Sequence, residues 1–373
     1  MRRKVCFVLP SLAGGGAERV AVEILNALDP AAWDRSMYLF AKEGPYLEQV
    51  ADGVHLAGGQ SASRFARWRE LRRFIASTQP DVVMVFLSYF TVLSAVRMAT
   101  TRTRVVLNQG TPVSAFLTDI DYGWRRPWRR RVFAAATRIG YAAADMVIAT
   151  SRGVADDLTA AFGIDPAQVR VIPNPVDLDA VRAAAGESIA DGDGSGLVAP
   201  LIVAAGRLAD VKNYPLLIDA LAMVRTRVPA RLLVLGQGDR LEELRRLAAE
   251  RGVGEAISWC GFQANPWKYI ARADVFASTS RYEGFGNVLA EAMACGVPVV
   301  ATRSAGTEDV VRDGVNGLLV PHSAEIVASA LSRLLINRAE RDRMAEAARE
   351  SADRFARPVV ARAYQAAFVE ALA

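Results

Sequence analysis

Short apolar runs alternate with longer amphipathic segments through the first half of the chain. Strands are predicted at 4–9, 37–40, 82–87, 104–108 and 146–150. The segments between them predict helices, most clearly at 17–28 and 64–77. In the 64–77 segment the apolar residues recur at helical spacing: Phe65, Trp68, Leu71, Phe74 and Ile75. Such an alternation of strands and helices predicts an α/β fold with a doubly wound parallel sheet.

The alternation stops near residue 173 and starts again at residue 201. Residues 183–200 are rich in Gly, Ala, Asp and Ser, which is typical of a linker. Further strands are then predicted at 201–205, 231–235, 257–260, 275–278 and 297–302, with helices from Tyr214, Arg240 and Asn287. We therefore expect one Rossmann-like domain over 1–182, a linker over 183–200 and a second Rossmann-like domain over 201–357.

Positive charge is concentrated in one part of the first domain. The chain carries a formal charge of +5, but residues 57–140 contain 14 Arg and four acidic residues and no Lys. That segment therefore has a net charge of +10 and the remainder of the chain −5. A basic region of this kind favours an anionic partner such as a membrane surface or a nucleic acid.

The cysteines and apolar runs bear on location. Cys6, Cys260 and Cys295 are far apart and lack metal-ligand spacing, so we expect a reduced, cytoplasmic protein. We expect no secretory leader. The longest membrane-like stretch, 82–96, is shorter than the roughly 20 residues that a spanning helix needs.

Residues 281–301 contain the first candidate site, at a loop between a predicted strand and a helix. Glu283 is followed by Gly284 and Gly286, the helix is predicted from Asn287, and Glu291 lies eight residues after Glu283. The first turn of a helix attracts anions, and glycines allow a close approach to its backbone. Two carboxylates beside a bound phosphate suit sugar hydroxyls, which indicates a nucleotide sugar. The alternative is an amphipathic helix with one buried Glu.

Two cations follow the strand predicted at 201–205. Gly206, Arg207 and Lys212 lie at a loop–helix junction, and ligands of open α/β sheets bind at the carboxyl ends of strands. Fixed cations there could stabilise a departing nucleoside diphosphate without a metal ion. The alternative is a pair of solvated surface charges.

The Glu283-x7-Glu291 stretch resembles the signature of the retaining glycosyltransferases of family four, which have the GT-B fold. The resemblance implies that Glu283 contacts the transferred sugar and that Glu291 binds the ribose hydroxyls. It assigns the phosphate to the loop amides, here those of Phe285, Gly286, Asn287 and Val288. The family has the same Gly-Arg-Leu…Lys motif as residues 206–212, which implies that Gly206 lines the donor site and that Arg207 and Lys212 contact the diphosphate. Gly238 would line the nucleotide pocket.

The same resemblance implies an architecture. Two Rossmann-like domains would face each other across a cleft, the first binding the acceptor and the second the nucleotide sugar. A C-terminal helix, 358–373, would cross back to the first domain.

The loop before residue 20 resembles that of members acting on lipid-linked or surface polysaccharide precursors. In it, the amides of Gly15 and Gly16 would face the diphosphate, and Arg19 would meet an acceptor phosphate or form a salt bridge with Glu18 or Glu23. The chain departs from the family at Gln109, near the place where many members have a His. Gln109 could orient a hydroxyl but could not accept its proton. We expect an oxygen of the donor phosphate to do so instead.

Arginine and tryptophan alternate just after residue 123. The cluster comprises Trp124, Arg125, Arg126, Trp128, Arg129, Arg130 and Arg131. Arg binds lipid headgroups and Trp prefers the membrane interface, so we expect an anionic membrane partner and no nucleic acid. Single-stranded nucleic acid and a solvated helix face are the alternatives. The Asp119-x-Asp121 pair nearby mimics a metal motif, which we treat as incidental.

The leading hypothesis is a metal-independent, retaining glycosyltransferase of the hexosyltransferase type, with no cofactor. It would move a sugar from a nucleotide diphosphate sugar to a lipid-linked glycan in envelope or exopolysaccharide synthesis, as a peripheral protein on the inner face of the cytoplasmic membrane. The alternatives are a GT-B nucleotide-sugar epimerase and an inert module that binds a nucleotide sugar or a membrane.

Overall fold

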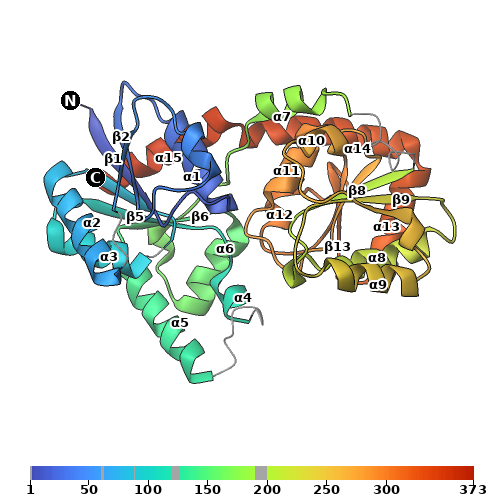
Figure 1. Cartoon of the computed structure of the whole chain (residues 1–373), viewed down its shortest axis with the longest axis horizontal. Helices are drawn as coiled ribbons and strands as arrows, with labels where there is room; N and C mark the ends of the chain where they lie inside the picture. The colour runs from blue at the N-terminus through green and yellow to red at the C-terminus, as the bar shows by residue number, and fades with distance from the viewer. Residues whose placement is uncertain (1, 60–62, 88, 119–126, 190–199) are drawn as a thin grey trace. The chain divides into compact units, whose positions relative to one another are not determined.

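The computed structural model of the protein describes residues 2–59, 63–87, 89–118, 127–189 and 200–373. The chain forms two compact units (Figure 1). Unit 1 comprises Met1–Pro175 together with Arg357–Ala373, and unit 2 comprises Val176–Ala356. Each unit is built around one parallel sheet, as the sequence predicted.

Unit 1 contains, within the described residues, a seven-stranded sheet of order β3-β2-β1-β4-β5-β6-β7. Neighbouring strands pair in parallel. The strands are β1 Arg3–Leu9, β2 Trp33–Leu39, β3 His55–Gly58, β4 Val82–Val85, β5 Arg104–Gln109, β6 Met146–Ala149 and β7 Val169–Val171.

Helices cover both faces of this sheet. They are α1 Gly16–Ala27, α2 Arg64–Thr78, α3 Tyr89–Ala99, α4 Val113–Thr118, α5 Pro127–Ala142, α6 Arg152–Asp156 and α15 Arg357–Leu372, with the short turns η1 Pro45–Gln49, η3 Asp157–Ala161 and η4 Pro166–Gln168. One core lies between the sheet, α1 and α15, and the other between the sheet and α2, α3, α5 and α6. Along β1, Phe7 faces the first core and Val8 the second. Because both faces are buried, the strands are continuous apolar runs.

Unit 2 repeats this design with a six-stranded sheet of order β10-β9-β8-β11-β12-β13 in the described residues. The strands are β8 Leu201–Ala205, β9 Arg231–Leu235, β10 Ile257–Trp259, β11 Val275–Ser278, β12 Val299–Thr302 and β13 Gly317–Val320. The helices are α7 Leu178–Ala185, α8 Tyr214–Val224, α9 Leu241–Glu250, α10 Trp267–Ile270, α11 Asn287–Ala294, α12 Thr307–Val310, α13 Ala324–Ile336 and α14 Arg338–Ala352, with the short turns η5 Asp210–Lys212, η6 Gly254–Ala256 and η7 Asp353–Phe355. One core packs α8, α9 and α13 on the sheet, and the other packs α7, α10, α11 and α14 (Figure 1).

Several helices begin at side chains that cap their first turn. Ser63, Ser151, Asp177, Ser323 and Asn337 each accept a hydrogen bond from the backbone N–H three residues further on. These caps satisfy donors that have no acceptor within the helix. They explain why α2 begins at Arg64, where the sequence predicted it.

The division between the units falls earlier than the sequence predicted. We expected the first domain to end at 182 and a linker over 183–200, but Leu178 and Val181 of α7 are buried in the core of unit 2. This helix is only eight residues long, and its last three residues, Ala183–Ala185, were assigned to the small-residue linker. Residues 190–199 lie outside the described residues. Within α2, Leu71 and Ile75 are buried as expected, but Phe65 is 68% exposed, so the predicted apolar face is shorter than its spacing suggested.

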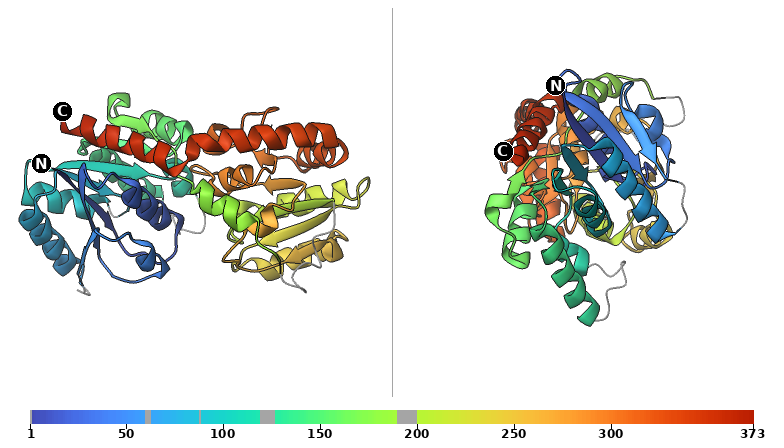
Figure 2. Two further views of the ribbon diagram at one scale, coloured as in Figure 1. Left: turned by 90° about the horizontal axis from the view of Figure 1, so that it is seen from above. Right: turned by 90° about the vertical axis from the view of Figure 1, so that its left-hand side faces the viewer.

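The last helix packs on unit 1. The chain leaves unit 2 at Ala356, and α15 lies against α1 and β5 (Figure 2). Tyr364 and Phe368 are fully buried there, and Asn108 Nδ2 in β5 donates to the Tyr364 hydroxyl at 2.9 Å. The C-terminus of the chain therefore completes the core that forms around its N-terminus.

The Asn108–Tyr364 hydrogen bond leads to a stability prediction. Changing Tyr364 to Phe leaves the buried Asn108 amide without this acceptor and should lower the free energy of unfolding by about 1–3 kcal/mol. Urea denaturation followed by tryptophan fluorescence measures this. Tyr46→Phe, outside the interface between α15 and β5, is the control and should change stability by less. Equal stability of the two variants would contradict the prediction.

Candidate functional site

The predicted donor residues gather at one point of the unit 2 sheet. β8 lies between β9 and β11, so the strand order reverses there. Ligands of open α/β sheets bind outside the carboxyl ends of the strands at such a switch point. Gly206 and Arg207 follow β8, and Glu283 follows β11, so the structure brings both predicted motifs to this point.

Lys212 and Glu283 form an ion pair. Lys212 Nζ lies 2.6 Å from Glu283 Oε1, and the two side chains are 22% and 15% exposed. The buried Ser280 hydroxyl donates to the same Oε1 at 2.7 Å. The stem of Lys212 passes over Gly206, where an added Cβ would lie 3.1 Å from Lys212 Cε. The sequence predicted that both residues contact a ligand, but it did not predict this pairing.

Hydrogen bonds hold the two loops together. The Thr279 hydroxyl donates to the carbonyls of Lys212, at 3.2 Å, and Asn213, at 3.0 Å. Tyr214, at the start of α8, donates its hydroxyl to the Gly206 carbonyl at 3.1 Å. Burial first, and then the Glu283 carboxylate, raise the pKa of Tyr214, so this hydroxyl remains a donor at neutral pH. Arg207 is exposed on the same loop.

The glycine loop at 284–286 presents its backbone rather than its side chains. Phe285 is 2% exposed and packs its ring 5.0 Å from that of Phe355. Gly286 has φ +88° and precedes the first turn of α11, which begins with Asn287 and Val288. A Cβ on Gly306 would lie 2.5 Å from the backbone of Gly284, so only glycine fits there. The loop is thus held firmly where its amides can meet an anion.

Glu291, on the second turn of α11, is buried with 5% exposure. Its Oε2 accepts a hydrogen bond from Trp267 Nε1 at 3.0 Å. Trp267 begins α10, where the Asn265 side chain accepts from the Trp267 N–H at 3.1 Å. Nothing in the linear pattern pairs Trp267 with Glu291, so the sequence did not predict that Trp267 belongs to the site. The carboxylate is therefore held in place by an aromatic donor.

Gly238 has a packing role. A Cβ on Gly238 would lie 2.5 Å from the Leu208 carbonyl oxygen, and one on Gly236 would lie 2.0 Å from that of Gly206. The loop after β9 consequently lies against the loop that carries Arg207. In this way Gly238 shapes the edge of the site where the sequence placed it.

The predicted acceptor residues lie in unit 1. Gly15 and Gly16 precede and begin α1, and an added Cβ on Gly16 would meet nothing within 4 Å. Arg19 forms an ion pair with Glu23 at 3.5 Å, one of the two alternatives that the sequence left open. Gln109 ends β5, one strand away from β4 and two from β1.

Gln109 belongs to a buried polar network. Its Oε1 accepts from the Tyr141 hydroxyl and lies 3.1 Å from the Tyr89 hydroxyl, while its Nε2 donates to the Thr111 carbonyl. Burial raises the pKa of both tyrosines, which keeps them protonated. A substrate hydroxyl at this place would meet an amide that is already well supported by protein groups.

The basic cluster is only partly described. Trp124, Arg125 and Arg126 lie outside the described residues, as do the side chains of Arg129 and Arg130. Trp128, in the first turn of α5, is 56% exposed, and Arg131 is exposed on the same helix. Val132 and Ile139 of α5 are 60% and 70% exposed.

The described residues form neither a membrane-spanning helix nor a metal centre. No described helix is both long enough and apolar enough to cross a membrane. The described His, Cys, Asp and Glu side chains nowhere gather in threes at metal-binding geometry. Asp119 and Asp121 lie outside the described residues.

Two protein-family models match the chain. Residues 14–180 match the model described as Glycosyltransferase Family 4, and residues 194–351 match the model described as Glycosyl transferases group 1. The second match covers the Lys212, Glu283 and Glu291 region. The first covers the loop that contains Gly15, Gly16 and Arg19.

The chain is also similar to individual proteins. It is 31% identical over 331 residues to the N-acetylgalactosamine-N,N'-diacetylbacillosaminyl-diphospho-undecaprenol 4-alpha-N-acetylgalactosaminyltransferase of Campylobacter jejuni, covering 85% of this chain and 86% of that protein. It is 36% identical over 169 residues to the lipopolysaccharide core biosynthesis glycosyltransferase LpsE of Rhizobium meliloti, covering 44% of this chain and 48% of that protein.

A solved structure shares the fold. The crystal structure of Anabaena Alr3699/HepE in complex with UDP-glucose superimposes with a TM-score of 0.79 at 22% sequence identity. The superposition covers 98% of this chain and 99% of that one.

Proposed function

We propose that this chain, which belongs to the family 4 and group 1 glycosyltransferases, transfers a sugar from a nucleotide diphosphate sugar to a lipid-linked glycan with retention of configuration. That the protein is a glycosyltransferase with the GT-B fold follows from the family. The proposal adds the donor, the acceptor and the stereochemistry. It rests mainly on one observation: Lys212, Glu283 and the start of α11 meet at the switch point of unit 2.

The donor assignment is supported by complementary charges. A nucleoside diphosphate carries two to three negative charges, which the Lys212 ammonium, the Arg207 guanidinium and the first turn of α11 would bind. Glu291 would accept hydrogen bonds from the ribose hydroxyls, in an orientation fixed by Trp267. The similar Anabaena structure holds UDP-glucose, which agrees with this class of donor.

Lys212 and Glu283 would act together in the reaction. An ammonium group has three hydrogens, so Lys212 can keep its contact with Glu283 and still donate to a phosphate oxygen. Negative charge grows on the diphosphate as the glycosidic bond breaks, and a fixed cation stabilises that charge most in the transition state. Glu283, held by Lys212 and Ser280, would orient a hydroxyl of the transferred sugar. The cations of Lys212 and Arg207 would make a metal ion unnecessary.

Retention without a histidine requires another proton acceptor. We place the acceptor hydroxyl on the same face of the sugar as the leaving phosphate, whose oxygen takes the proton. Gln109 is bound to Tyr141 and Thr111 and cannot accept a proton, so it would at most orient the hydroxyl. An epimerase would need acid and base groups beside the sugar. Gln109, near the place where many members have a His, cannot supply one, so the epimerase is the weaker alternative. An inert module would not need the Lys212–Glu283 pair.

The acceptor assignment is supported by the activities for which two relatives are named. The Campylobacter protein acts on a diphospho-undecaprenol glycan, and the Rhizobium protein is assigned to lipopolysaccharide core synthesis. We assign the lipid-linked glycan to unit 1, beside Gly15, Gly16, Arg19 and Gln109. Such an acceptor lies in a membrane. The exposed Trp128 and the basic cluster then fit a peripheral position on the cytoplasmic face.

A two-step experiment tests the function. A thermal-shift screen with UDP, GDP, ADP and TDP identifies the base, because a bound diphosphate raises apparent stability. The sugars of that nucleotide are then incubated with protein and lipid extract, and the products are separated. A sugar transferred to lipid with retained configuration supports the proposal. An isomerised donor supports the epimerase, and an unchanged donor supports the inert module.

The Glu291 assignment predicts a loss of donor affinity. Glu291→Ala should weaken binding of the nucleoside diphosphate by about 1.5–3 kcal/mol in calorimetry, because ribose hydrogen bonds are lost. Trp267→Phe should cause a smaller loss, since the carboxylate remains but loses its indole donor. Trp259→Phe, in β10, is the matched control. Unchanged affinity in Glu291→Ala would rule out the ribose assignment.

The Lys212 assignment predicts a loss of rate. Lys212→Met keeps much of the side-chain volume but removes the charge, so kcat should fall on the order of 100- to 1000-fold, with a smaller rise in the donor KM. Arg207→Lys should give an intermediate loss if the guanidinium binds two oxygens. EDTA should not affect the wild-type rate. The assignment fails if Lys212→Met changes only KM, or if activity needs a divalent ion.

The membrane assignment predicts charge-dependent binding. Changing Arg129, Arg130 and Arg131 to Ser should weaken binding to anionic liposomes by roughly 1 kcal/mol per residue. Activity on a short soluble acceptor should survive. The control changes Arg245, Arg246 and Arg251, at or after α9 in unit 2, to Ser and should bind liposomes normally. Equal binding by both triple variants would show that the cluster is only a solvated helix face.

A further inference from the structure

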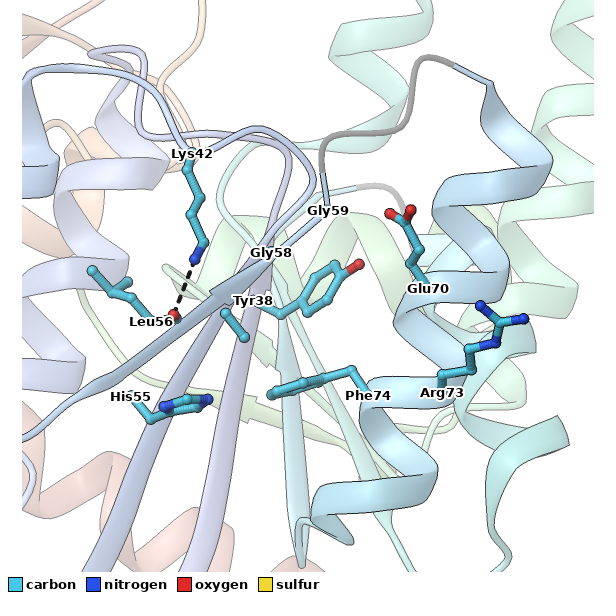
Figure 3. A pocket seen from close by; sticks show the side chains of 10 residues that line it. Tyr38, Lys42, His55, Leu56, Gly58, Gly59, Glu70, Arg73 and Phe74 are labelled. Atoms are coloured by element: carbon cyan, nitrogen blue, oxygen red, sulfur yellow. Dashed lines mark hydrogen bonds between the residues drawn. The ribbon is translucent and has the colours of Figure 1, made fainter.

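Unit 1 contains a pocket that none of the assignments above uses. It lies toward the carboxyl ends of β2 and β3, beside α2, and has a volume of about 540 Å³ (Figure 3). β3 forms the edge of the sheet, and Gly58 ends it. A Cβ on Gly58 would lie 2.4 Å from the Leu39 carbonyl oxygen, so the wall between the two strands admits only glycine.

The Tyr38 hydroxyl is the unusual group of this pocket. Tyr38 is 2% exposed, and its hydroxyl has no hydrogen-bond partner among the described residues. Figure 3 shows the hydroxyl directed to the side of the pocket where Gly59 and Glu70 lie. A Cβ on Gly59 would lie 3.3 Å from this hydroxyl and 1.9 Å from Glu70 Oε2, so the hydroxyl and the carboxylate both border the space that a side chain at Gly59 would fill. A buried polar group without a partner requires an explanation.

The surroundings of the Tyr38 hydroxyl keep it protonated. Burial first, and then the Glu70 carboxylate and Cys6, raise the pKa of Tyr38 to about 12. The hydroxyl is therefore protonated at neutral pH and can donate. The Glu70 side chain, whose Oε2 lies on the same side of the pocket, can accept a hydrogen bond. Exposed Arg73 of α2 and Lys42 add donors at the rim of the pocket.

Flat rings form another wall. The rings of His55 and Phe74 are stacked, with their centroids 6.3 Å apart and their planes at 10°. The Phe74 ring also packs 5.1 Å from that of Tyr38. The pocket therefore combines apolar ring faces with a neighbouring donor and acceptor.

This combination selects the ligand class. Lys42 and Arg73 attract an anion to the rim, but a phosphate that reached the Tyr38 hydroxyl would lie beside the Glu70 carboxylate, which repels it. An apolar ligand would leave the Tyr38 hydroxyl buried and unpaired, which is unfavourable. A sugar ring has hydroxyls that both donate and accept, together with C–H faces that pack on rings. A sugar could therefore pair with both the hydroxyl and the carboxylate and also pack on the rings.

The pocket is close to the loop that we assign to the acceptor. The segment after β2 is bound to the end of β1 and to the segment that follows β1. Three backbone hydrogen bonds join them: Phe40 N to Leu9 O at 3.1 Å, Ala41 N to Pro10 O at 2.8 Å and Leu12 N to Glu43 O at 2.9 Å. Lys42 of the pocket lies on the first segment, and the second leads to Gly15. A chain of sugars could extend from one to the other within unit 1.

We propose that this pocket binds one hexopyranose unit of the acceptor glycan, at a distance from the hydroxyl that is glycosylated. The sugar would accept a hydrogen bond from Tyr38, donate one to Glu70 and pack on the His55 and Phe74 rings. That this sugar belongs to the acceptor rests on the proposed function. The binding of a sugar in the pocket does not.

Tyr38→Phe is a clean test, because the hydroxyl that it removes has no protein partner in the described structure. Its thermal stability should be equal to that of the wild type or higher. Saturation-transfer NMR, without donor, uses the methyl α- and β-glycosides of glucose, galactose, mannose, N-acetylglucosamine and N-acetylgalactosamine. At least one should bind the wild type, and Tyr38→Phe should weaken its Kd about two- to tenfold. Tyr46→Phe, which removes a phenolic hydroxyl outside the pocket, is the matched control.

Several results would overturn the proposal. These are no binding of any glycoside, equal binding by Tyr38→Phe and Tyr46→Phe, or displacement of the glycoside by inorganic phosphate, which would make this an anion site. A kinetic experiment then tests the link to the acceptor. With acceptor glycans of increasing length, Tyr38→Phe should raise the KM of long acceptors only, leaving kcat and the donor KM unchanged. If sugars bind the pocket but no donor is ever consumed, the proposed function fails and the sugar site remains.

Discussion

The donor site depends on backbone segments that approach each other without side chains between them. At the carboxyl edge of the unit 2 sheet, an added Cβ on Gly236 would lie 2.0 Å from the Gly206 carbonyl oxygen, and one on Gly306 would lie 2.5 Å from Gly284. The first contact fixes the loops after β8 and β9 against each other, and the second fixes the loops after β11 and β12. The hydrogen bonds from the Thr279 hydroxyl to the Lys212 and Asn213 carbonyls join the two pairs of loops, so glycines and Thr279 together set the positions of Lys212 and Glu283. Larger residues at these positions would separate the loops before they affected any charge.

The fixed loops allow a partly buried ion pair to be kept ready for a substrate. A charge that leaves water loses hydration energy, and only a well-placed partner offsets that loss. Lys212 has such a partner in Glu283, which also accepts from Ser280. A diphosphate that enters the site therefore meets a cation whose position is already set. Little reorganisation is needed when charge develops, which is the condition for efficient electrostatic catalysis.

The central strands and the edge strand β10 were predictable from the sequence, and the other edge strands of the described residues were not. β8, β9 and β11 have the predicted bounds, because strands buried on both faces are continuous apolar runs. The unpredicted β3, β7 and β13 are all edge strands of three or four residues. Their short runs give too weak a periodic signal. The same reason explains why the Tyr38 pocket, which β3 borders, had no counterpart in the sequence analysis.

The residues of the candidate site were predictable singly, but their partners were not. Lys212 and Glu283 are 71 positions apart, and Trp267 and Glu291 are 24 apart, so each pair exists only once the strands are ordered. Local spacing identified the carboxylates, since a loop followed by a helix is a local feature. It could not show that an indole fixes one carboxylate and a lysine the other. Gln109 was likewise found by position, while its contact with Tyr141 depends on packing. The Arg19–Glu23 pair spans one helical turn, which is why the sequence could offer it as an alternative.

The two units solve recognition in different ways. In unit 2, the predicted phosphate contacts are backbone amides at the start of α11, and the side chain of Phe285 is buried. With the proposed donor, such a site would recognise what all nucleotide sugars share, and it would tolerate few changes because its glycines are in close contact. In unit 1, the proposed sugar pocket is lined by the buried Tyr38 of β2 and by residues of the edge strand β3 and of α2. Substitutions of its exposed residues, such as His55 and Arg73, disturb the core less. A protein built this way can change its acceptor by substituting residues in one pocket while the donor chemistry stays intact.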